Sequence, residues 1–311
     1  MELSIVFPVY NEEGNLVNLH KKLKDALGEL RKEHEIIFVD DGSTDRSFEI
    51  LSKLHKKDKT VKVIKFRRNF GQTAAILAGF QNSKGKIVVT MDADLQNDPA
   101  DIKLLLDKME EGYDVVSGWR YDRKDPFITK RLPSLFSNWF ARKLVKLDIH
   151  DFGCMLKAYR REAVKNLRIY GEMHRYITAI IAANGYKVSE VKVSHHKRQE
   201  GESKYGMARL MKGMLDLLYI KFWSSYSTRP LHFFGFFGLV QYILSFLIFL
   251  EQLIKALIVK QVIVGPLFLI AVFLAIIGTQ FVLFGFLSEI LIRSYFSNTG
   301  EGSFIIEKIL E

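Results

Sequence analysis

The chain has 311 residues, which is more than one average domain needs and enough for a catalytic domain with an appended segment. Its formal net charge of +10 suits an anionic membrane surface, phosphate-bearing substrates or nucleic acid, and the charge alone does not distinguish these partners. The single cysteine, Cys154, excludes an internal disulfide and a zinc site built from several cysteines, and we interpret it as an inert apolar side chain.

Strand-like and helix-like segments alternate along the first 120 residues. The predicted strands cover residues 3–9, 35–40, 61–66, 87–91 and 114–118, and the predicted helices cover residues 12–32, 44–58, 71–83 and 99–111. This alternation is typical of an α/β, Rossmann-like fold in which helices cover both faces of a mostly parallel sheet. The first strand follows the initial Met-Glu directly, without a signal peptide, so we expect this part of the chain to remain in the cytosol.

A segment rich in lysine and arginine follows at residues 120–146. Apolar residues recur at helical spacing over residues 131–146, which is typical of an amphipathic helix at a bilayer interface. An ordinary helix packed on the sheet is the alternative. A second amphipathic helix is predicted at residues 205–230. Between these two helices the pattern predicts a return to the globular domain, with strands at 154–159 and 187–194 and helices at 162–167 and 176–184.

Two long apolar segments follow, at residues 232–250 and 264–288. Each is long enough to cross a hydrocarbon core of roughly 30 Å as a helix. Two buried core helices are the alternative. We expect a transmembrane hairpin with a short loop at residues 251–261, and the flanking basic residues place both termini in the cytoplasm, at the cell membrane. The predicted parts are a cytoplasmic catalytic domain at residues 1–204 and a juxtamembrane helix at 205–230. A two-helix hairpin follows at 231–293, and a cytoplasmic tail with a short strand at 294–311.

Two carboxylates one residue apart, Asp92 and Asp94, follow the apolar run at residues 87–91. Because side chains alternate along a strand, we expect both to point the same way at its carboxyl end, where open α/β sheets bind ligands. Two like charges this close repel unless a cation lies between them, and hard oxygen ligands suit Mg²⁺ or Mn²⁺. Such an ion usually completes its coordination with substrate phosphates, so the pattern predicts a nucleoside-diphosphate site. An acidic turn before the next helix is the alternative.

Polar residues also follow the first two predicted strands. Tyr10 and Glu12 come after the first strand, and Asp41 and Gly42 come after the second. An aspartate at such an edge can accept a hydrogen bond from a base or a ribose hydroxyl, and a glycine permits close backbone approach. Asp-Gly-Ser is also ordinary turn chemistry with a helix cap. The convergence of three strand ends on one edge favours a binding site.

These motifs resemble family 2 glycosyltransferases of the GT-A fold. The resemblance rests on Pro-Val-Tyr-Asn-Glu at residues 8–12, Val-Asp-Asp-Gly-Ser-Thr-Asp at 39–45 and Met-Asp-Ala-Asp-Leu-Gln at 91–96. The segments Asp-Phe-Gly-Cys-Met-Leu-Lys-Ala-Tyr-Arg-Arg at 151–161 and Gly-Glu-Ser-Lys-Tyr at 201–205 are similar to polyisoprenyl-phosphate glycosyltransferases. That group includes dolichyl-phosphate mannose and glucose synthases and undecaprenyl-phosphate sugar transferases, and the similarity covers nearly all of the chain.

The resemblance implies a role for each matching position. It implies contacts to the base and ribose from Pro8, Tyr10, Glu12, Asp41 and Asp92. It implies metal coordination by Asp92, Asp94 and Gln96. It implies binding of donor or acceptor phosphate by Arg120, Arg131, Ser134, Arg198 and Lys204. Guanidinium groups bind phosphate through paired hydrogen bonds, which agrees with the arginines in this set. Asp94 and Asp151 are the candidate catalytic residues.

Asp151 either positions the acceptor or acts as a general base. A sugar hydroxyl acceptor needs a base to remove its proton. A phosphate monoester has a second pKa of about 6 and is mostly a dianion at neutral pH. We therefore predict that Asp151 positions the acceptor or basic residues, with base catalysis as the weaker alternative.

The predicted function is metal-dependent, inverting transfer of a hexose from a nucleotide-diphosphate sugar to polyprenyl or dolichyl phosphate at the cytoplasmic membrane face. A UDP-sugar such as UDP-glucose is favoured, and dolichyl-phosphate mannose synthesis from GDP-mannose is the alternative. A processive polysaccharide synthase is disfavoured because the chain has no Arg-Trp dipeptide, and a non-catalytic membrane scaffold is disfavoured by the intact acidic motif. No nucleic-acid partner is expected, because the aromatic residues lie in the membrane-like stretches. The resemblance suggests a homo-oligomer, such as a tetramer.

Overall fold

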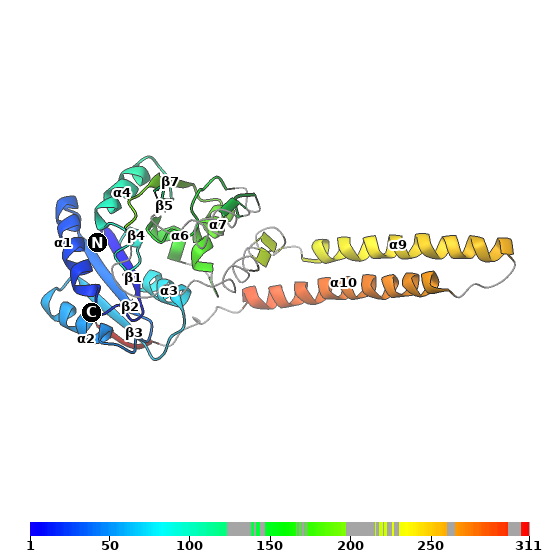
Figure 1. Cartoon of the computed structure of the whole chain (residues 1–311), viewed down its shortest axis with the longest axis horizontal. Coiled ribbons are helices and arrows are strands. Elements are labelled where there is room, and N and C mark those ends of the chain that lie inside the picture. Colours follow the sequence, from blue (N-terminus) through cyan, green and yellow to red (C-terminus); the bar gives the residue numbers. More distant parts are fainter. Residues whose placement is uncertain are drawn as a thin grey trace. The chain divides into compact units, whose positions relative to one another are not determined.

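The computed structural model describes residues 1–122, 138–139, 141–143, 147–165, 167, 169, 171, 173–196, 215, 218–219, 221–222, 226, 230–259, 265–297 and 306–310. The chain divides into two units, Met1–Lys221 with Gly302–Glu311, and Phe222–Glu301. Each unit is described by itself (Figure 1). Most of the predicted interfacial helix at 131–146 and of the predicted juxtamembrane helix at 205–230 lies outside the described residues.

The first unit is built on an eight-stranded sheet in the order β7-β5-β6-β4-β1-β2-β3-β8. The strands are β1 (Leu3–Val9), β2 (His34–Asp40), β3 (Val61–Phe66), β4 (Ile87–Thr90), β5 (Val115–Trp119), β6 (Lys157–Arg160), β7 (Val188–Lys192) and β8 (Ile306–Leu310). Strands β1 to β4 pair in parallel, and β5 pairs in parallel with β7. Because β6 is antiparallel to both β4 and β5, the strands β4 and β5 run in the same direction. The mostly parallel sheet of the sequence prediction is confirmed.

Helices cover both faces of this sheet, as predicted (Figure 1). They are α1 (Leu16–Leu30), α2 (Ser47–Lys57), α3 (Gln72–Asn82), α4 (Ile102–Glu110), α6 (Arg161–Lys165) and α7 (Ile177–Ala183), with short 3₁₀ turns η1 (Pro99–Asp101) and η3 (Met173–Tyr176). Successive strand residues enter opposite cores: Ile5 packs with the apolar faces of α1, α2 and α4, whereas Val6 packs with those of α3, α6 and α7. Burial on both faces explains why these strands are almost continuously apolar.

Several predicted elements of this unit begin later than expected, and hydrogen bonds explain the difference in two of them. The strand predicted at 154–159 begins at Lys157, because residues 151–156 form a loop held by polar contacts of Asp151. The helix predicted at 12–32 begins at Leu16. The backbone amide of Glu12 donates to Ser47 Oγ instead, at 2.9 Å. In both places side-chain hydrogen bonds take the backbone out of the regular element.

The second unit contains two long helices, α9 (Pro230–Val259) and α10 (Pro266–Ser297). Their contacts show antiparallel packing. Gly238 lies against Gly278, and further along α9 Ser245 Oγ donates to the carbonyl oxygen of Ala271 at 2.7 Å. Only 6% and 11% of their most apolar windows are buried, so the apolar surface is largely exposed. The prediction of a loop at 251–261 was wrong for residues 251–259, which continue α9. A Glu251–Lys255 ion pair of 2.6 Å, one helical turn apart, lies within that extension.

The strand predicted in the tail is β8, which pairs antiparallel with β3 at one edge of the sheet. It belongs to the first unit, although α9 and α10 precede it in the chain. The chain therefore leaves the first unit, forms the helical pair and returns to the same sheet.

Candidate functional site

The topology gathers the polar segments at one edge of the sheet. Strands β1 to β5 share one direction, so the residues that follow them meet at the edge formed by their carboxyl ends. Strand β6 runs the opposite way, so the loop that precedes it, residues 151–156, lies at this edge as well. The predicted residues that the structure brings to this edge are Pro8, Tyr10, Glu12, Asp41, Asp92, Asp94, Gln96, Arg120 and Asp151.

Asp41 is buried at this edge, and its carboxylate holds the segment that follows β3. Its Oδ1 accepts from the amide of Phe70 at 2.7 Å, and its Oδ2 accepts from the amide of Gly71 at 2.9 Å and from Asn69 Nδ2 at 3.0 Å. Burial raises the pKa of Asp41 to about 6, although the hydrogen bonds from Phe70 and Gly71 act to lower it. Asp41 thus fixes the segment 69–71 at this edge of the sheet.

The turns that follow β1 and β2 are linked by hydrogen bonds. Asn11 Oδ1 accepts from the amide of Thr44 at 2.8 Å, and the amide of Asn11 donates to Ser43 Oγ at 3.0 Å. Gly42 has φ +68°, and a Cβ there would lie 2.4 Å from the backbone carbon of Arg68. The segment that approaches the backbone of Gly42 closely is therefore the neighbouring loop at Arg68 and Asn69.

The acidic motif lies in the loop after β4. The strand ends at Thr90, so strand alternation does not determine the direction of Asp92 and Asp94. Gln72 Nε2 donates to Asp92 Oδ1 at 2.7 Å, and the amide of Gln96 donates to Asp94 Oδ1 at 3.1 Å, with Leu95 at φ 60° between them. These contacts fix both carboxylates in a short turn.

The chemistry of this donor set fits a hard divalent cation. Asp92 and Asp94 supply carboxylate oxygens, and Gln96 offers an amide oxygen in the same turn. Within the part of the chain that the structure describes, no cluster of three or more His, Cys, Asp or Glu side chains is arranged to hold a metal ion.

The segment after β7 runs beside this acidic loop. The amide of His196 donates to the carbonyl oxygen of Gln96 at 2.9 Å, and the amide of Ser194 donates to Asp101 Oδ2 at 2.6 Å. His195 is buried, whereas the ring of His196 is exposed and lies 3.3 Å from Asp98 Oδ2. This segment supports the acidic loop from the side of β7.

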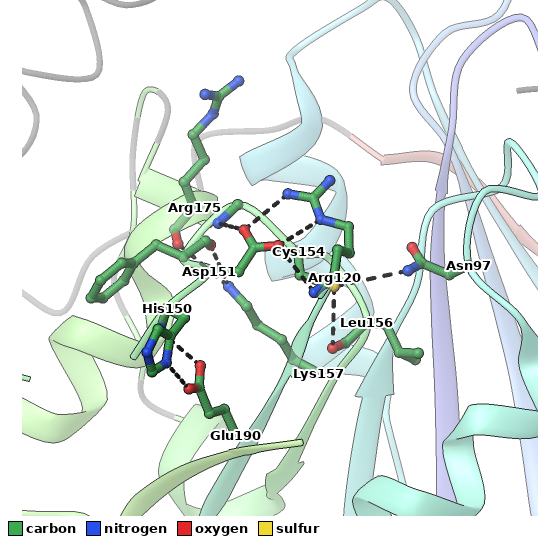
Figure 2. Close-up of polar contacts among 11 residues, drawn as sticks. Asn97, Arg120, His150, Asp151, Cys154, Leu156, Lys157, Arg175 and Glu190 are labelled. Carbon is green, nitrogen blue, oxygen red and sulfur yellow. Dashed lines mark hydrogen bonds and ion pairs between the residues drawn. The ribbon is translucent and has the colours of Figure 1, made fainter. Parts of the chain in front are cut away.

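Arg120 and Asp151 form a two-bond ion pair on the other side of the edge (Figure 2). Arg120 Nε donates to Asp151 Oδ2 at 2.7 Å, and Nη2 donates to Oδ1 at 2.9 Å. The amide of Gly153 adds a bond of 3.1 Å to Asp151 Oδ1. Asp151 is only 3% exposed, so the pair is mostly shielded from water. The geometry fits the predicted positioning role of Asp151.

A buried lysine lies beneath this ion pair. Lys157 Nζ donates to the carbonyl oxygens of Phe152 at 3.0 Å and Arg175 at 3.4 Å (Figure 2). Burial lowers the pKa of Lys157 to about 8, and the charges of Asp151 and Asp92 act in the opposite direction.

Cys154 is fully buried beside Asn97, whose Nδ2 lies 3.8 Å from the sulfur. Burial raises the pKa of the Cys154 thiol to about 11. The thiolate is therefore scarce at neutral pH, which agrees with the interpretation of Cys154 as an inert packing residue.

Four predicted phosphate-binding residues lie outside the described residues: Arg131, Ser134, Arg198 and Lys204. The sequence prediction also missed three contributors that the structure brings to the edge. These are the segment 69–72, Lys157 and the turn at Met173–Tyr176. The segment 69–72 could have been found, because it follows the third predicted strand as the other motifs follow theirs. The other two carry no such positional signal.

Known proteins resemble this chain over much or all of its length. Residues 4–168 match the family described as Glycosyl transferase family 2. The dodecaprenyl-phosphate galacturonate synthase of Rhizobium johnstonii is 35% identical over 100% of this chain and 94% of its own length. The undecaprenyl-phosphate 4-deoxy-4-formamido-L-arabinose transferase of Pseudomonas aeruginosa is 38% identical over 99% of this chain and 90% of its own length.

Solved structures share the fold at much lower identity. Glucosyl-3-phosphoglycerate synthase from Mycobacterium tuberculosis, in complex with Mn²⁺, UDP and phosphoglyceric acid, aligns with a TM-score of 0.55 at 16% identity, over 72% of this chain and 78% of that one. Residues 1–349 of TarS from S. aureus, in complex with UDP-GlcNAc, align with a TM-score of 0.51 at 20% identity, over 71% of this chain and 66% of that one. At these identities the likeness shows a common fold and no more.

Proposed function

This chain belongs to glycosyl transferase family 2, and from that premise we propose that it transfers a sugar from a nucleoside diphosphate to the phosphate of a polyprenyl lipid. The observation that carries the proposal is the single sheet edge that holds both the Asp92 turn and the Arg120–Asp151 pair. The relatives named for dodecaprenyl and undecaprenyl phosphate support this class of acceptor.

The donor would bind on the side of the edge formed by β1, β2 and β4. We assign contacts to the base and ribose to Pro8, Tyr10, Glu12, Asp41 and Asp92. Asp92, Asp94 and Gln96 would hold Mg²⁺ or Mn²⁺. When bound, that ion would neutralise part of the charge on the departing diphosphate. Gln72 keeps Asp92 oriented for this task through its 2.7 Å hydrogen bond.

The acceptor would bind on the side of Arg120 and Asp151. An oxygen of the lipid phosphate forms the new bond to the anomeric carbon from the face opposite the diphosphate, whose bond to that carbon breaks, so the configuration inverts. The phosphate is mostly a dianion above its second pKa of about 6 and needs no base. Asp151 binds Nε and Nη2 of Arg120 and thereby orients the guanidinium plane. Arg131, Ser134, Arg198 and Lys204 would complete the phosphate contacts.

A UDP-sugar is the favoured donor, with UDP-glucose as the first candidate and GDP-mannose as the alternative. The two relatives are named for galacturonate and for 4-deoxy-4-formamido-L-arabinose, which is a pentose derivative. They widen the set of sugars to be tested beyond hexoses.

The helices α9 and α10 would anchor the enzyme at its lipid substrate. Both are long and apolar enough to cross a bilayer, and their apolar windows are largely exposed. Two crossings return the chain to the side from which it left, which agrees with the pairing of β8 to β3 in the first unit. We therefore propose that residues 1–204 form a cytoplasmic catalytic domain, that residues 231–293 form the membrane hairpin, and that both termini are cytoplasmic.

The full-length chain, purified and reconstituted with undecaprenyl phosphate, tests the proposal directly. Radiolabelled UDP-glucose, UDP-galacturonate, UDP-4-deoxy-4-formamido-L-arabinose and GDP-mannose would each be supplied with Mn²⁺ or with EDTA. We expect one of them to label the lipid phase in the presence of Mn²⁺ only. The Asp94→Asn variant should lose this labelling. No labelled lipid from any donor would contradict the proposal.

A further inference from the structure

The search for a further functional group leads to Lys157, a fully buried cation that the proposed mechanism does not use. It is the first residue of β6 and lies between Ser117 of β5 and Thr90 of β4. Its side chain is 0% exposed, which is rare for a lysine because removing an ammonium group from water is unfavourable. The contacts of its ammonium group should therefore show what the buried charge does.

The contacts of Lys157 join two separate backbone segments. Its Nζ donates to the carbonyl oxygen of Phe152, the neighbour of Asp151, and to the carbonyl oxygen of Arg175 in η3. Figure 2 shows Lys157 extending toward Arg175 and the loop that carries Asp151. One ammonium group therefore fixes the loop that orients Arg120 and the turn that carries Arg175.

The turn is also fastened at its other end. Thr73 Oγ1 donates to the carbonyl oxygen of Gly171 at 2.6 Å and lies 2.8 Å from His174 Nδ1. Thr73 follows Gln72, the residue that binds Asp92. The position of η3 is thus set jointly by the start of α3 and by Lys157.

Arg175 brings a second guanidinium group to this part of the site. Its side chain is partly exposed and extends away from Lys157, on the same side as the guanidinium group of Arg120 (Figure 2). Two guanidinium groups can together bind a dianionic phosphate, because each can offer parallel N–H donors.

We infer that Lys157 is a positioning residue that holds Arg120 and Arg175 as a pair for one phosphate group of the substrates. This inference rests on the proposed function and adds Arg175 to the phosphate-binding residues. The phosphate belongs either to the lipid acceptor or to the donor diphosphate. Because Arg120 is oriented by Asp151, we expect the acceptor.

The test measures the KM for undecaprenyl phosphate and, separately, the Kd for UDP in the presence of Mn²⁺. Arg175→Gln and Lys157→Met are each expected to raise the acceptor KM about tenfold and to leave the Kd for UDP unchanged. The double variant should be little worse than either single variant, because both changes act on the same contact. Arg161→Gln, an exposed arginine at the opposite edge of the sheet, is the matched control and should behave like the wild type.

Each other outcome has a defined meaning. A raised Kd for UDP with an unchanged acceptor KM keeps the arginine pair and assigns its phosphate to the donor. An Arg175→Gln variant with both constants unchanged overturns the inference, as do equal losses in both constants or strictly additive effects in the double variant. If Lys157→Met does not fold, the Arg175→Gln measurement still decides. A wild-type chain that labels no lipid contradicts the proposed function itself, and that result is distinct from all of these.

Discussion

Gln72 and Asp92 are joined by a hydrogen bond of 2.7 Å from Nε2 to Oδ1, so the first residue of α3 orients the first carboxylate of the acidic turn. The bond links two strand ends, because α3 follows the loop after β3, whereas Asp92 follows β4. The preceding residues of that same loop bind Asp41. Contacts made by residues 69–72 therefore connect the proposed nucleotide contact with the proposed metal ligands.

Replacing Gln72 should weaken metal binding without unfolding the protein. In Gln72→Leu the carboxylate of Asp92 loses its amide donor and its fixed orientation. Loss of such an outer partner of a metal ligand typically lowers affinity or activity about 10- to 100-fold. We expect the Mn²⁺ concentration for half-maximal transfer to rise by about that factor. Gln81→Leu, an exposed glutamine at the other end of α3, is the control. Equal Mn²⁺ dependence in the two variants would contradict the assigned role.

Asp151→Asn tests positioning against base catalysis. The substitution weakens the two-bond pair with Arg120, whose atoms lie 2.7 and 2.9 Å apart in the wild type. Misplacement of a binding group can lower the rate about a hundredfold. We expect a loss of that size at every pH between about 6.5 and 9, because the acceptor is already ionised there.

The matched control for this experiment is Asp148→Asn, since Asp148 is 81% exposed and lies three residues away. It should retain wild-type transfer. Recovery of the Asp151→Asn variant as the pH rises would instead indicate that Asp151 removes a proton in the wild type.

The parallel sheet could be predicted from the sequence because its strands are buried on both faces. Ile5 and Val6 enter different cores, so successive residues of the strand are apolar and the strand stands out. The common direction of the strands then placed Tyr10, Asp41 and Asp92 at one edge. That part of the candidate site follows from topology alone.

The contacts between strand ends could not be predicted in the same way. The bond from Gln72 to Asp92 depends on the path of two loops in space, and neither residue type specifies its partner. Lys157 continues an ordinary strand pattern, and only the fold shows that its ammonium group meets the carbonyl oxygens of Phe152 and Arg175. The pairing of β8 with β3 is likewise a long-range contact, because α9 and α10 lie between these strands in the sequence.

The pH dependence of stability should report the burial of Asp41. Its pKa is about 6 in the folded protein, against an ordinary value of 3.8. The folded state therefore binds more protons than the unfolded chain between these values, so the contribution of Asp41 to stability is full below about pH 4 and is lost as the pH rises through about 6. The change amounts to at most about 3 kcal/mol.

The measurement compares thermal unfolding of the wild type and Asp41→Asn in one detergent from about pH 4 to pH 7. Since asparagine does not titrate, we expect the wild-type melting temperature to fall by several degrees relative to the variant across this window. Asp25→Asn, at an exposed position on α1, should give a curve parallel to the wild type. Parallel curves for Asp41→Asn as well would contradict a raised pKa.

The packing of α9 against α10 should depend on Gly238 and not on Gly235, although both are glycines of the same helix. A Cβ at Gly238 would lie 2.9 Å from the carbonyl oxygen of Gly278 and 2.9 Å from Val282 Cγ2, whereas a Cβ at Gly235 meets nothing within 4 Å. Small residues at such a crossing let two membrane helices approach closely. Gly238→Ala should therefore force the helices apart and destabilise the pair by about 1–3 kcal/mol.

Gly235→Ala should leave thermal unfolding in detergent unchanged or slightly improved, because alanine favours helix more than glycine does. Equal melting temperatures for the two variants would mean that the helices do not pack through the glycine contact, and the hairpin arrangement would then have to be abandoned.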